Sequence, residues 1–344
     1  MADNDRRDAA RRPRPSTSHD VASLAGVSQA TVSRALRDCT HVGKETRRRV
    51  QAAAAQLDYR PNAAAVRMRG ARSNTIAVVL LSAPDAGRAS LNPFYYDLLG
   101  AIEAEATRRK LSLILSYQGE PDTLRCDFEQ RGEADGVIVI GNATNRAAWR
   151  YFGAAHEAGS HIVAWGAPDD SLPTIRADNA QGAMLAVDHL VARGCTRIAF
   201  VGPGWADQQA FGARRAGYLA ALERHGLDPI EGDVPSEGDR LRQGAAAVDA
   251  LHERCIAFDA VFAASDGLAL GAARRLRELD RKVPEEVAVI GFDGGWHSRD
   301  NDPALTTVEQ DIAQASALLV AAIADRSADR ARAVGVRLVR RASA

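Results

Sequence analysis

Residues 20–36 read Asp-Val-Ala-Ser-Leu-Ala-Gly-Val-Ser-Gln-Ala-Thr-Val-Ser-Arg-Ala-Leu, and this stretch decides the fold of the N-terminal part of the chain. Its apolar residues recur at helical spacing and predict two short amphipathic helices separated by a sharp turn at Gly26. Glycine suits that turn because it adopts positive φ without a side-chain penalty. Ser28 is a good N-cap for the second helix, since its hydroxyl can accept from the exposed amides of the first turn.

The first turns of the second predicted helix carry side chains that suit base edges and phosphates. Gln29, Ser33 and Arg34 are hydrogen-bonding residues, and the small Ala30 lies between them. This combination predicts a helix-turn-helix whose second helix enters the major groove of DNA. The alternative is an ordinary helical hairpin, but the turn glycine, the cap and the polar face all agree with the first interpretation.

The pattern Val-Ala-x-x-Ala-Gly-Val-Ser-x-x-Thr-Val-Ser-Arg over residues 21–34 resembles the DNA-binding domain of the lactose-repressor (LacI/GalR) family of bacterial transcription regulators. The resemblance covers about residues 17–342. Ser18 departs from it, because relatives usually carry an apolar residue there. The resemblance implies the following DNA-contacting residues: Thr17, Ser28, Gln29, Ala30, Thr31, Ser33, Arg34, His41, Asn62, Ala65 and Met68.

Charge is divided unequally along the chain. Residues 1–73 hold 15 Lys and Arg against 7 Asp and Glu, a net charge of +8, and the remaining residues hold 29 against 37, a net charge of −8. A basic head on an acidic body is typical of a nucleic-acid-binding module joined to another domain. A solvated basic tail is the alternative for the first residues, but Arg47, Arg48 and Arg49 lie on a helix predicted over 44–57.

We expect a disordered basic tail at 1–16, a helix-turn-helix domain at 17–60, and a hinge helix with its linker at 61–73. The Ala-rich segment 63–70 is too short to form a stable isolated helix in water. The resemblance implies that it folds on DNA and enters the minor groove, with Met68 as the wedge between base steps.

From residue 74 onward, apolar runs alternate with helical segments. These runs lie at 76–81, 111–115, 137–140, 162–164, 198–201, 260–263 and 287–290, and a final strand is predicted at 336–340. Continuous apolar strands between amphipathic helices indicate an α/β fold with parallel sheets covered on both faces. The resemblance implies a periplasmic-binding-protein-like core at 74–344, made of two Rossmann-like subdomains. We place the first at 74–176 plus 309–326 and the second at 177–308 plus 327–344.

Loops at the carboxyl ends of the predicted strands are rich in polar and aromatic residues, and ligands bind there in open α/β sheets. Resemblance implies that three elements line an effector site: the aromatic residues of Asn92-Pro93-Phe94-Tyr95, the first arginine of the Arg-x-x-Gly-Tyr segment from Arg214, and Asp293. A guanidinium and a carboxylate there would grip sugar hydroxyls. The expected effector-binding residues are Phe94, Tyr95, Arg214, Ser265, Asp266, Asp293 and Trp296.

Several of these residues have a structural alternative. Phe94 or Tyr95 can instead staple the following helix, and Asp266 can cap the helix that begins there. Asp178 has the same capping alternative. A surface ion pair is the alternative for Arg214, although its neighbour Arg215 fits that role better. Asp239 stands about where many relatives carry an aromatic lid residue.

These observations predict an operator-binding regulator, a repressor controlled by a small molecule, and the resemblance implies a homodimer formed through the core. We expect a sugar effector, with a purine-type corepressor as the runner-up. A solute-binding protein without regulatory function fits the core but not the helix-turn-helix. The chain has no Gly-x-Ser-x-Gly elbow, Walker loop or metal-spaced His pair, so we expect no enzyme activity, metal or cofactor. Its four cysteines are scattered and no apolar run approaches a membrane span, so we expect a cytoplasmic protein.

Overall fold

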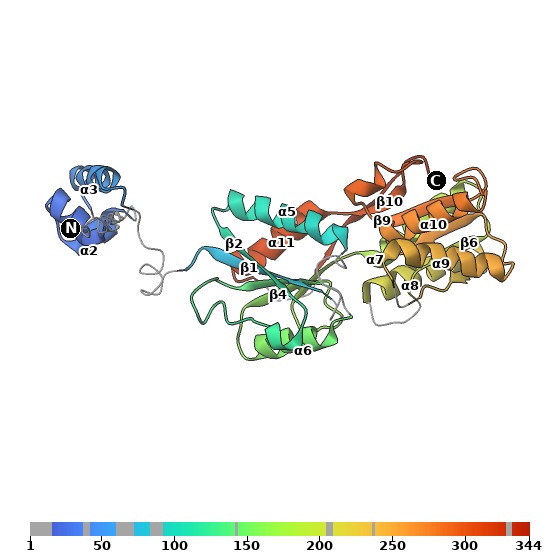
Figure 1. The fold of residues 1–344 in the computed structure, drawn as a ribbon, viewed down its shortest axis with the longest axis horizontal. Coiled ribbons are helices and arrows are strands. Elements are labelled where there is room, and N and C mark those ends of the chain that lie inside the picture. Colours follow the sequence, from blue (N-terminus) through green and yellow to red (C-terminus); the bar gives the residue numbers. More distant parts are fainter. Residues whose placement is uncertain are drawn as a thin grey trace, which may run out of the picture. The chain divides into compact units, whose positions relative to one another are not determined.

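The computed structural model describes residues 16–36, 42–59, 72–82, 92–141, 144–203, 209–235, 238–327 and 332–344 (Figure 1). They belong to two compact units, one within residues 1–71 and the other formed by Arg72–Ala344. Each unit is described by itself below. The expected contacts at His41, Asn62, Ala65 and Met68, and the hinge at 63–70, lie outside the described residues.

The N-terminal unit is helical, with α1 (Ser18–Ala25), α2 (Gln29–Ala35) and α3 (Lys44–Gln56). The predicted turn at Gly26 is confirmed, since this residue adopts φ +62° and ends α1. Ser28 caps α2 as predicted, because its hydroxyl accepts from the amide of Thr31. Val21, Val32 and Val50, one from each helix, are at most 1% exposed and form the centre of a small apolar core.

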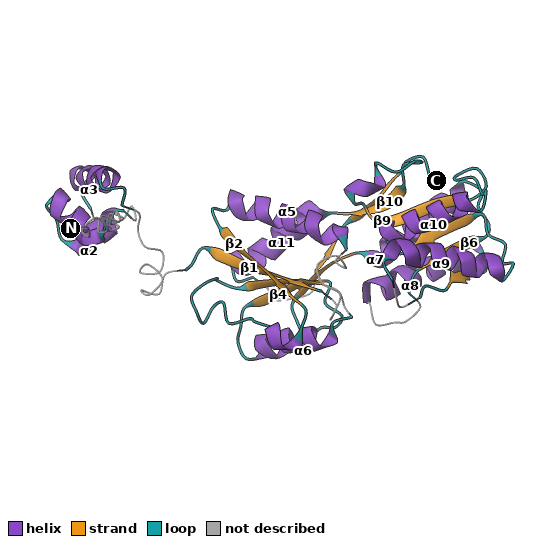
Figure 2. Ribbon diagram, viewed as in Figure 1, coloured by secondary structure: helices purple, strands orange, loops and turns teal. Residues whose placement is uncertain are grey.

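The first sheet of the core runs in the order β11-β5-β4-β3-β1-β2. Its strands are β1 (Thr75–Leu81), β2 (Ser112–Gln118), β3 (Val137–Gly141), β4 (Ile162–Trp165), β5 (Thr174–Ala177) and β11 (Arg332–Val334). All of its pairings are parallel. The helices α5 (Pro93–Arg108) and α11 (Ile312–Ala324) cover one face and α6 (Arg146–Glu157) covers the other, as Figure 2 shows. A short 3₁₀ helix, η2 (Pro121–Thr123), follows β2.

Strand β1 shows why its sequence is apolar throughout. Ile76 and Leu80 pack in the cluster under α5 and α11, whereas Ala77 and Leu81 pack in the cluster under α6. Alternate side chains of a strand point to opposite faces, so a strand covered on both faces needs apolar residues at every position. Burial of each large aliphatic side chain stabilises the fold by about 1.5–3 kcal/mol relative to exposure.

The second sheet runs in the order β12-β10-β9-β8-β6-β7. Its strands are β6 (Ile198–Val201), β7 (Ile230–Gly232), β8 (Ala260–Ala263), β9 (Ala288–Asp293), β10 (Thr306–Gln310) and β12 (Val336–Val339). Its helices are α7 (Asn179–Ala192), α8 (Gln209–His225), α9 (Arg240–Glu253) and α10 (Asp266–Glu278), and a 3₁₀ helix, η3 (Trp296–Ser298), follows β9. β12 is antiparallel to β10, and the other pairings are parallel.

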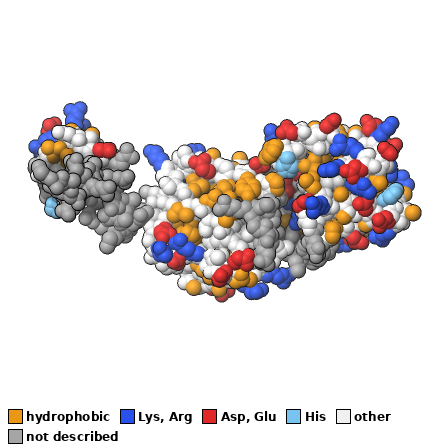
Figure 3. Space-filling model, in the orientation of Figure 1, with side chains coloured by type: hydrophobic (Ala, Val, Ile, Leu, Met, Phe, Trp, Pro, Cys, Tyr) orange, Lys and Arg blue, Asp and Glu red, His pale blue; other side chains and the backbone are white. Residues whose placement is uncertain are grey.

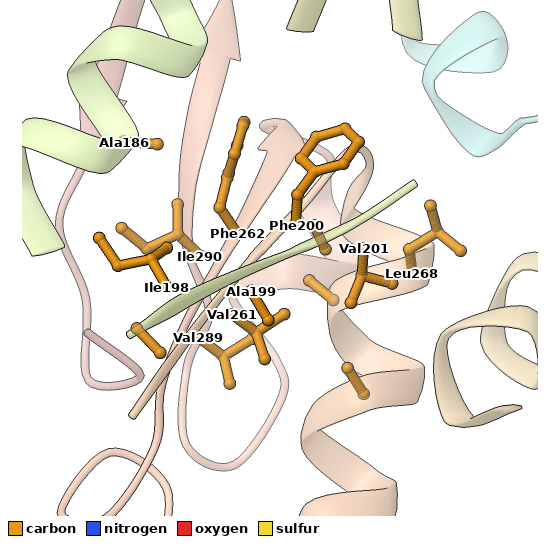
Figure 4. Packing of buried hydrophobic residues seen from close by; sticks show 14 of the residues in the cluster. Ala186, Ile198, Ala199, Phe200, Val201, Val261, Phe262, Leu268, Val289 and Ile290 are labelled. Carbon is orange, nitrogen blue, oxygen red and sulfur yellow. The ribbon is translucent and has the colours of Figure 1, made fainter. Parts of the chain in front are cut away.

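The core of this sheet again uses both faces. Figure 4 shows Phe200 and Phe262 pointing to one side of their strands and Val261 and Val289 to the other. The rings of Phe200 and Phe262 lie 5.7 Å apart between their centroids. Because parallel strands end at the same edge of a sheet, this packing also fixes where Asp293 and the residues after β8 lie.

The chain crosses between the sheets after β5, after β10 and after β11, which agrees with the predicted two-subdomain α/β fold. In one detail the pairing differs from the expected division: β11, which we grouped with the second subdomain, pairs with β5 in the first sheet. Strands β5, β7, β10 and β11 were not predicted. They are short or polar, and the buried hydroxyls of Thr306 and Thr307 in β10 are satisfied by hydrogen bonds.

Among the helices that the structure describes, none combines the length and apolar character that a membrane crossing requires. On the face drawn in Figure 3, positive and negative side chains are interspersed over the part of the core that carries the second sheet. The net negative charge of the core therefore does not gather into a single patch on this face.

Candidate functional site

Helix α2 exposes most of the face that the sequence predicted, although Ser33 is half-buried. Gln29, Ala30 and Arg34 are exposed, whereas Val32 and Ala35 on the opposite side are buried against α1 and α3. The exposed side of α2 thus presents the amide of Gln29 and the methyl group of Ala30 from its first turn, and the guanidinium of Arg34 from its last turn. These are the groups that recognise adenine, the thymine methyl and guanine or phosphate in a major groove.

Two hydrogen bonds fix this face. The Gln29 Nε2 group donates to Ser18 Oγ over 2.7 Å, which joins the predicted base-contacting residue to the first residue of α1. The Ser28 and Thr31 hydroxyls lie 2.9 Å apart. Thr17, another predicted contact, forms a capping box with Asp20, and its hydroxyl donates to that carboxylate over 2.7 Å.

In the core, Arg214 and Asp293 lie together, as the sequence analysis expected. Arg214 on α8 is 5% exposed, Asp293 at the end of β9 is 3% exposed, and Arg214 Nη1 lies 3.2 Å from Asp293 Oδ1. Arg214 also donates from Nε to Asn179 Oδ1 over 2.8 Å, and its guanidinium carbon lies 3.6 Å from the centre of the Phe292 ring. The surface ion pair belongs instead to Arg215, which contacts Glu231.

Asp293 is the centre of this cluster. It accepts from Asn92 Nδ2 over 3.0 Å and from Gln310 Nε2 over 2.9 Å. Asn92 precedes α5 on the first sheet, so the carboxylate bridges the two halves of the core. Burial raises the pKa of Asp293, and the Arg214 guanidinium opposes that rise. Its φ of +121° is a strained conformation for a residue with a side chain, and such strain is concentrated at functional sites.

Ser265 and Asp266 lie beside this cluster in supporting positions. The capping role considered for Asp266 was wrong by one residue, because Ser265 is the N-cap of α10 and accepts from the Leu268 amide. Asp266, 1% exposed, instead accepts from the Gly295 amide over 2.9 Å and from the Thr307 hydroxyl. Burial, with the nearby Asp293 charge, raises the pKa of Asp266 to about 8. The capping role considered for Asp178 is confirmed.

The predicted aromatic residues have different surroundings. Phe94 is 2% exposed and its ring centroid lies 5.8 Å from that of Trp165, which favours the packing role over a ligand contact. Tyr95 donates from its hydroxyl to the Gly141 carbonyl over 3.0 Å. Burial, followed by the Asp293 charge, raises the pKa of Tyr95 to about 12. Trp296 on η3 is 61% exposed, with its ring against His297.

Sequence reasoning missed Arg240, the first residue of α9. Its neighbour Asp239 is the N-cap of that helix and accepts from the Arg242 amide over 2.9 Å. The Arg240 guanidinium carbon lies 5.0 Å from the centre of the Phe211 ring, which Arg214 approaches at 5.4 Å. A basic residue in the first turn of a helix was the available signal, since the helix dipole disfavours a cation there.

Within the described residues, no group of three or more His, Cys, Asp or Glu side chains is arranged to hold a metal ion. The polar groups at the core site are the guanidinium groups of Arg214 and Arg240, two carboxylates, several amides and the phenol of Tyr95. This set is suited to binding hydroxyls and charged groups of a small molecule. Together with the helix-turn-helix, it defines the class of the protein: a DNA-binding regulator joined to a ligand-binding core.

Comparison with known proteins agrees with that class. Residues 17–62 match the family described as bacterial regulatory proteins, lacI family, and residues 187–344 match the periplasmic binding protein-like domain. The transcriptional regulator CelR of Thermobifida fusca is 32% identical over 307 residues, 87% of this chain and 88% of the relative. The ribose operon repressor of Escherichia coli K12 is 29% identical over 297 residues, 86% and 88% of the two chains.

The crystal structure of the Lac repressor dimer bound to operator and an anti-inducer shares the fold, with a TM-score of 0.75. It is 26% identical, and the match covers 96% of this chain and 99% of that one. The chain belongs to the lacI family of bacterial regulatory proteins. It is a DNA-binding transcription regulator, and the relatives named here are transcription regulators as well.

Proposed function

We propose that the chain is a cytoplasmic homodimeric repressor that binds a pseudo-palindromic operator and is controlled by a sugar-like effector in the core. The proposal is carried by the presence of two features in one chain: exposed DNA-binding side chains on α2 and a buried Arg214–Asp293 cluster in the core. Two related heads reading one site require a symmetric site, because operator symmetry mirrors the symmetry of the dimer.

At the operator, Gln29 and Ala30 face base edges, and Arg34 reaches a base or a phosphate at the groove wall. Exposure of all three side chains supports this assignment. Ser28, Thr31, Ser33 and Thr17 would supply contacts around them. The segment 61–73, with Met68 as its wedge, serves as the hinge between the head at 17–60 and the core at 74–344.

In the core, Arg214 and Asp293 bind the effector, with Tyr95 of α5 and Trp296 of η3 as further contacts. Ser265 and Asp266 support them through the start of α10. Two relatives are named for a sugar operon, one as a ribose operon repressor and one as a sucrose operon repressor. Their names support a sugar as the class of ligand. Removal of either Arg214 or Asp293 would leave its partner buried and unsatisfied, so each variant should lose the effector response.

The hydrogen bond from Asn92 to Asp293 offers a route for control. It joins the first half of the core to the carboxylate that would hold the ligand. A ligand that competes for this carboxylate would change the contact between the two halves. Coupling of about 1–3 kcal/mol per effector is typical of such regulators.

Selection from a random duplex library with the full chain tests the proposal. The expected result is a set of pseudo-palindromic sequences that Gln29→Ala no longer enriches. Sedimentation should show a dimer bound to one selected duplex. Enrichment of sequences without symmetry, or none at all, would contradict the proposed operator function.

A further inference from the structure

Arg240 lies where two helices of the core approach each other closely. It is the first residue of α9, which packs against α10, and a Cβ added at Gly267 would lie 2.9 Å from the Cβ of Arg240. The absence of a side chain at Gly267 therefore makes room for the stem of Arg240 over the start of α10. The next residue toward the sheet, Asp266, belongs to the candidate effector cluster.

The Arg240 guanidinium joins that cluster without a carboxylate of its own. Its Nη1 donates to Gln243 Oε1 over 2.8 Å, and its carbon lies over the Phe211 ring that Arg214 also approaches. In the part of the chain that the structure describes, no carboxylate oxygen forms an ion pair with Arg240, whereas Arg214 pairs with Asp293.

The two guanidinium groups of the cluster are consequently paired unequally, since a carboxylate pairs with Arg214 and none pairs with Arg240 among the described residues. Burial lowers the pKa of Arg240, and Tyr95 and Asp293 act in the opposite direction. Two guanidinium groups, those of Arg214 and Arg240, therefore lie at the cluster, and Asp293 forms an ion pair with the first of them. A cation in the first turn of α9 also opposes the helix dipole, which favours anions at that end. A negatively charged ligand would supply the anionic partner that Arg240 lacks, and it would suit the N-terminal end of α9.

We propose that the effector is a sugar-sized anion whose carboxylate or phosphate is bound by Arg240. The proposal rests on the effector site proposed above and assigns it a chemical class. The planar guanidinium fork matches both kinds of anion through paired N–H donors. Arg214 and Asp293 remain available for the hydroxyls of the same molecule, which would lie between Arg240 and the first half of the core.

Matched probes separate this inference from the binding of a neutral sugar. The full chain is titrated with D-glucose, D-glucuronate and D-glucose 6-phosphate, with D-galactose and D-galacturonate, and with D-ribose and D-ribose 5-phosphate. A ligand that binds only the native state raises the melting temperature. We expect at least one anionic probe to raise it, and calorimetry to give that probe about tenfold or more higher affinity than its neutral partner. The uronates and the sugar phosphates are tested separately, so the group of probes with the higher affinity shows whether the site prefers a carboxylate or a phosphate.

Arg240→Gln and Arg242→Gln are the matched variants. Both remove one positive charge from the first turn of α9, but the Arg242 side chain is 85% exposed and forms an ion pair with Asp239. Arg240→Gln should reduce the affinity for the anionic probe about tenfold or more, and Arg242→Gln by about twofold or less. Circular dichroism of both variants checks that α9 is intact.

Three results would overturn the inference: no shift with any anionic probe, equal affinity for an anionic probe and its neutral partner, or equal effects of the two variants. A neutral sugar that binds and changes operator affinity would remove the inference but support the proposed function. Loss of operator selection by the parent chain would instead remove the proposed function, whatever the probes show.

Discussion

The helix-turn-helix and the core cluster keep their functional side chains in opposite surroundings. Gln29, Ala30 and Arg34 are exposed and lie within two turns of one helix. Arg214 and Asp293 are almost fully buried and lie 79 residues apart in the sequence. Substitutions of the exposed side chains on α2 should change the stability of the fold very little. At the buried Arg214–Asp293 pair, by contrast, the same groups contribute both to ligand binding and to the stability of the core.

The two regions should differ most in how much their functional side chains contribute to stability. Asp293→Ala should lower the free energy of unfolding of the core by about 3–5 kcal/mol, because it leaves the Arg214 guanidinium buried without its carboxylate. Gln29→Ala should change stability by about 0.5 kcal/mol or less. Urea unfolding of the two variants measures both values. If both variants lowered the free energy of unfolding equally, the Arg214–Asp293 pair would be exposed to solvent and not buried.

At the exposed face of α2, a smaller effect is expected, and it concerns DNA binding and not stability. Gln29→Ala should cost about 1–3 kcal/mol at particular operator base pairs, since it removes a side chain that reads a base edge. Binding to non-specific DNA should remain nearly the same. Competition between single-base operator variants measures this. If the variant ranked all operators as the parent does, Gln29 would not contact a base.

The pH dependence of stability tests the buried half. The pKa of Asp266 is raised to about 8, so the folded state binds a proton that the unfolded state has released above about pH 4. The contribution of Asp266 to stability is complete below the unfolded pKa and is lost as the pH rises toward 8. The slope is at most about 1.4 kcal/mol per pH unit.

Asp266→Asn should therefore flatten the profile of unfolding free energy between about pH 4 and 8 relative to the parent. Asparagine can still accept from the Thr307 hydroxyl, so the two proteins should be closest in stability at the acidic end. Parallel slopes for variant and parent would show that Asp266 is ionised at neutral pH.

The smallest expected effect concerns Ser18, whose hydroxyl accepts from Gln29. Ser18→Ala frees the Gln29 amide, and should weaken operator binding by about 0.5–1.5 kcal/mol through lost positioning. In a double-mutant cycle with Gln29→Ala, the two effects should not add. Additive effects would mean that Ser18 contacts DNA by itself or acts only on the fold.

The two regions also differ in how far sequence alone predicts them. The helix-turn-helix could be predicted almost entirely, since Gly26, Ser28 and the apolar spacing are local signals that lie within one short stretch. The apolar strands of both sheets could be predicted for the same reason. Strand β10 could not, because Thr306 and Thr307 are buried only through hydrogen bonds with distant groups.

At the core cluster, sequence pattern indicated Arg214 and Asp293, but their surroundings depend on long-range contacts. Gln310 and Asn92 donate to Asp293 from other segments. Asn92 belongs to a segment that the sequence pattern singled out, but no local pattern shows that either residue bonds to Asp293. Arg240 reaches the cluster only because α9 packs on Gly267 of α10. Asp266 was considered as a possible N-cap because the first residue of a helix is uncertain by one position in a sequence. In the structure Ser265 is the N-cap of α10, and Asp266 is the buried residue that follows it.

The central claim is that the Arg214–Asp293 cluster receives the effector that controls operator binding. It is tested most directly by fluorescence anisotropy of a selected operator duplex, titrated with the probe compound that most raises the melting temperature of the chain. We predict that this compound changes the operator affinity of the parent chain about fivefold or more, in line with a typical coupling energy. At the same concentration, the compound should not change the operator affinity of the Asp293→Asn and Arg214→Ala variants. A response of either variant at the parental ligand concentration would contradict the account and place the effector elsewhere in the core.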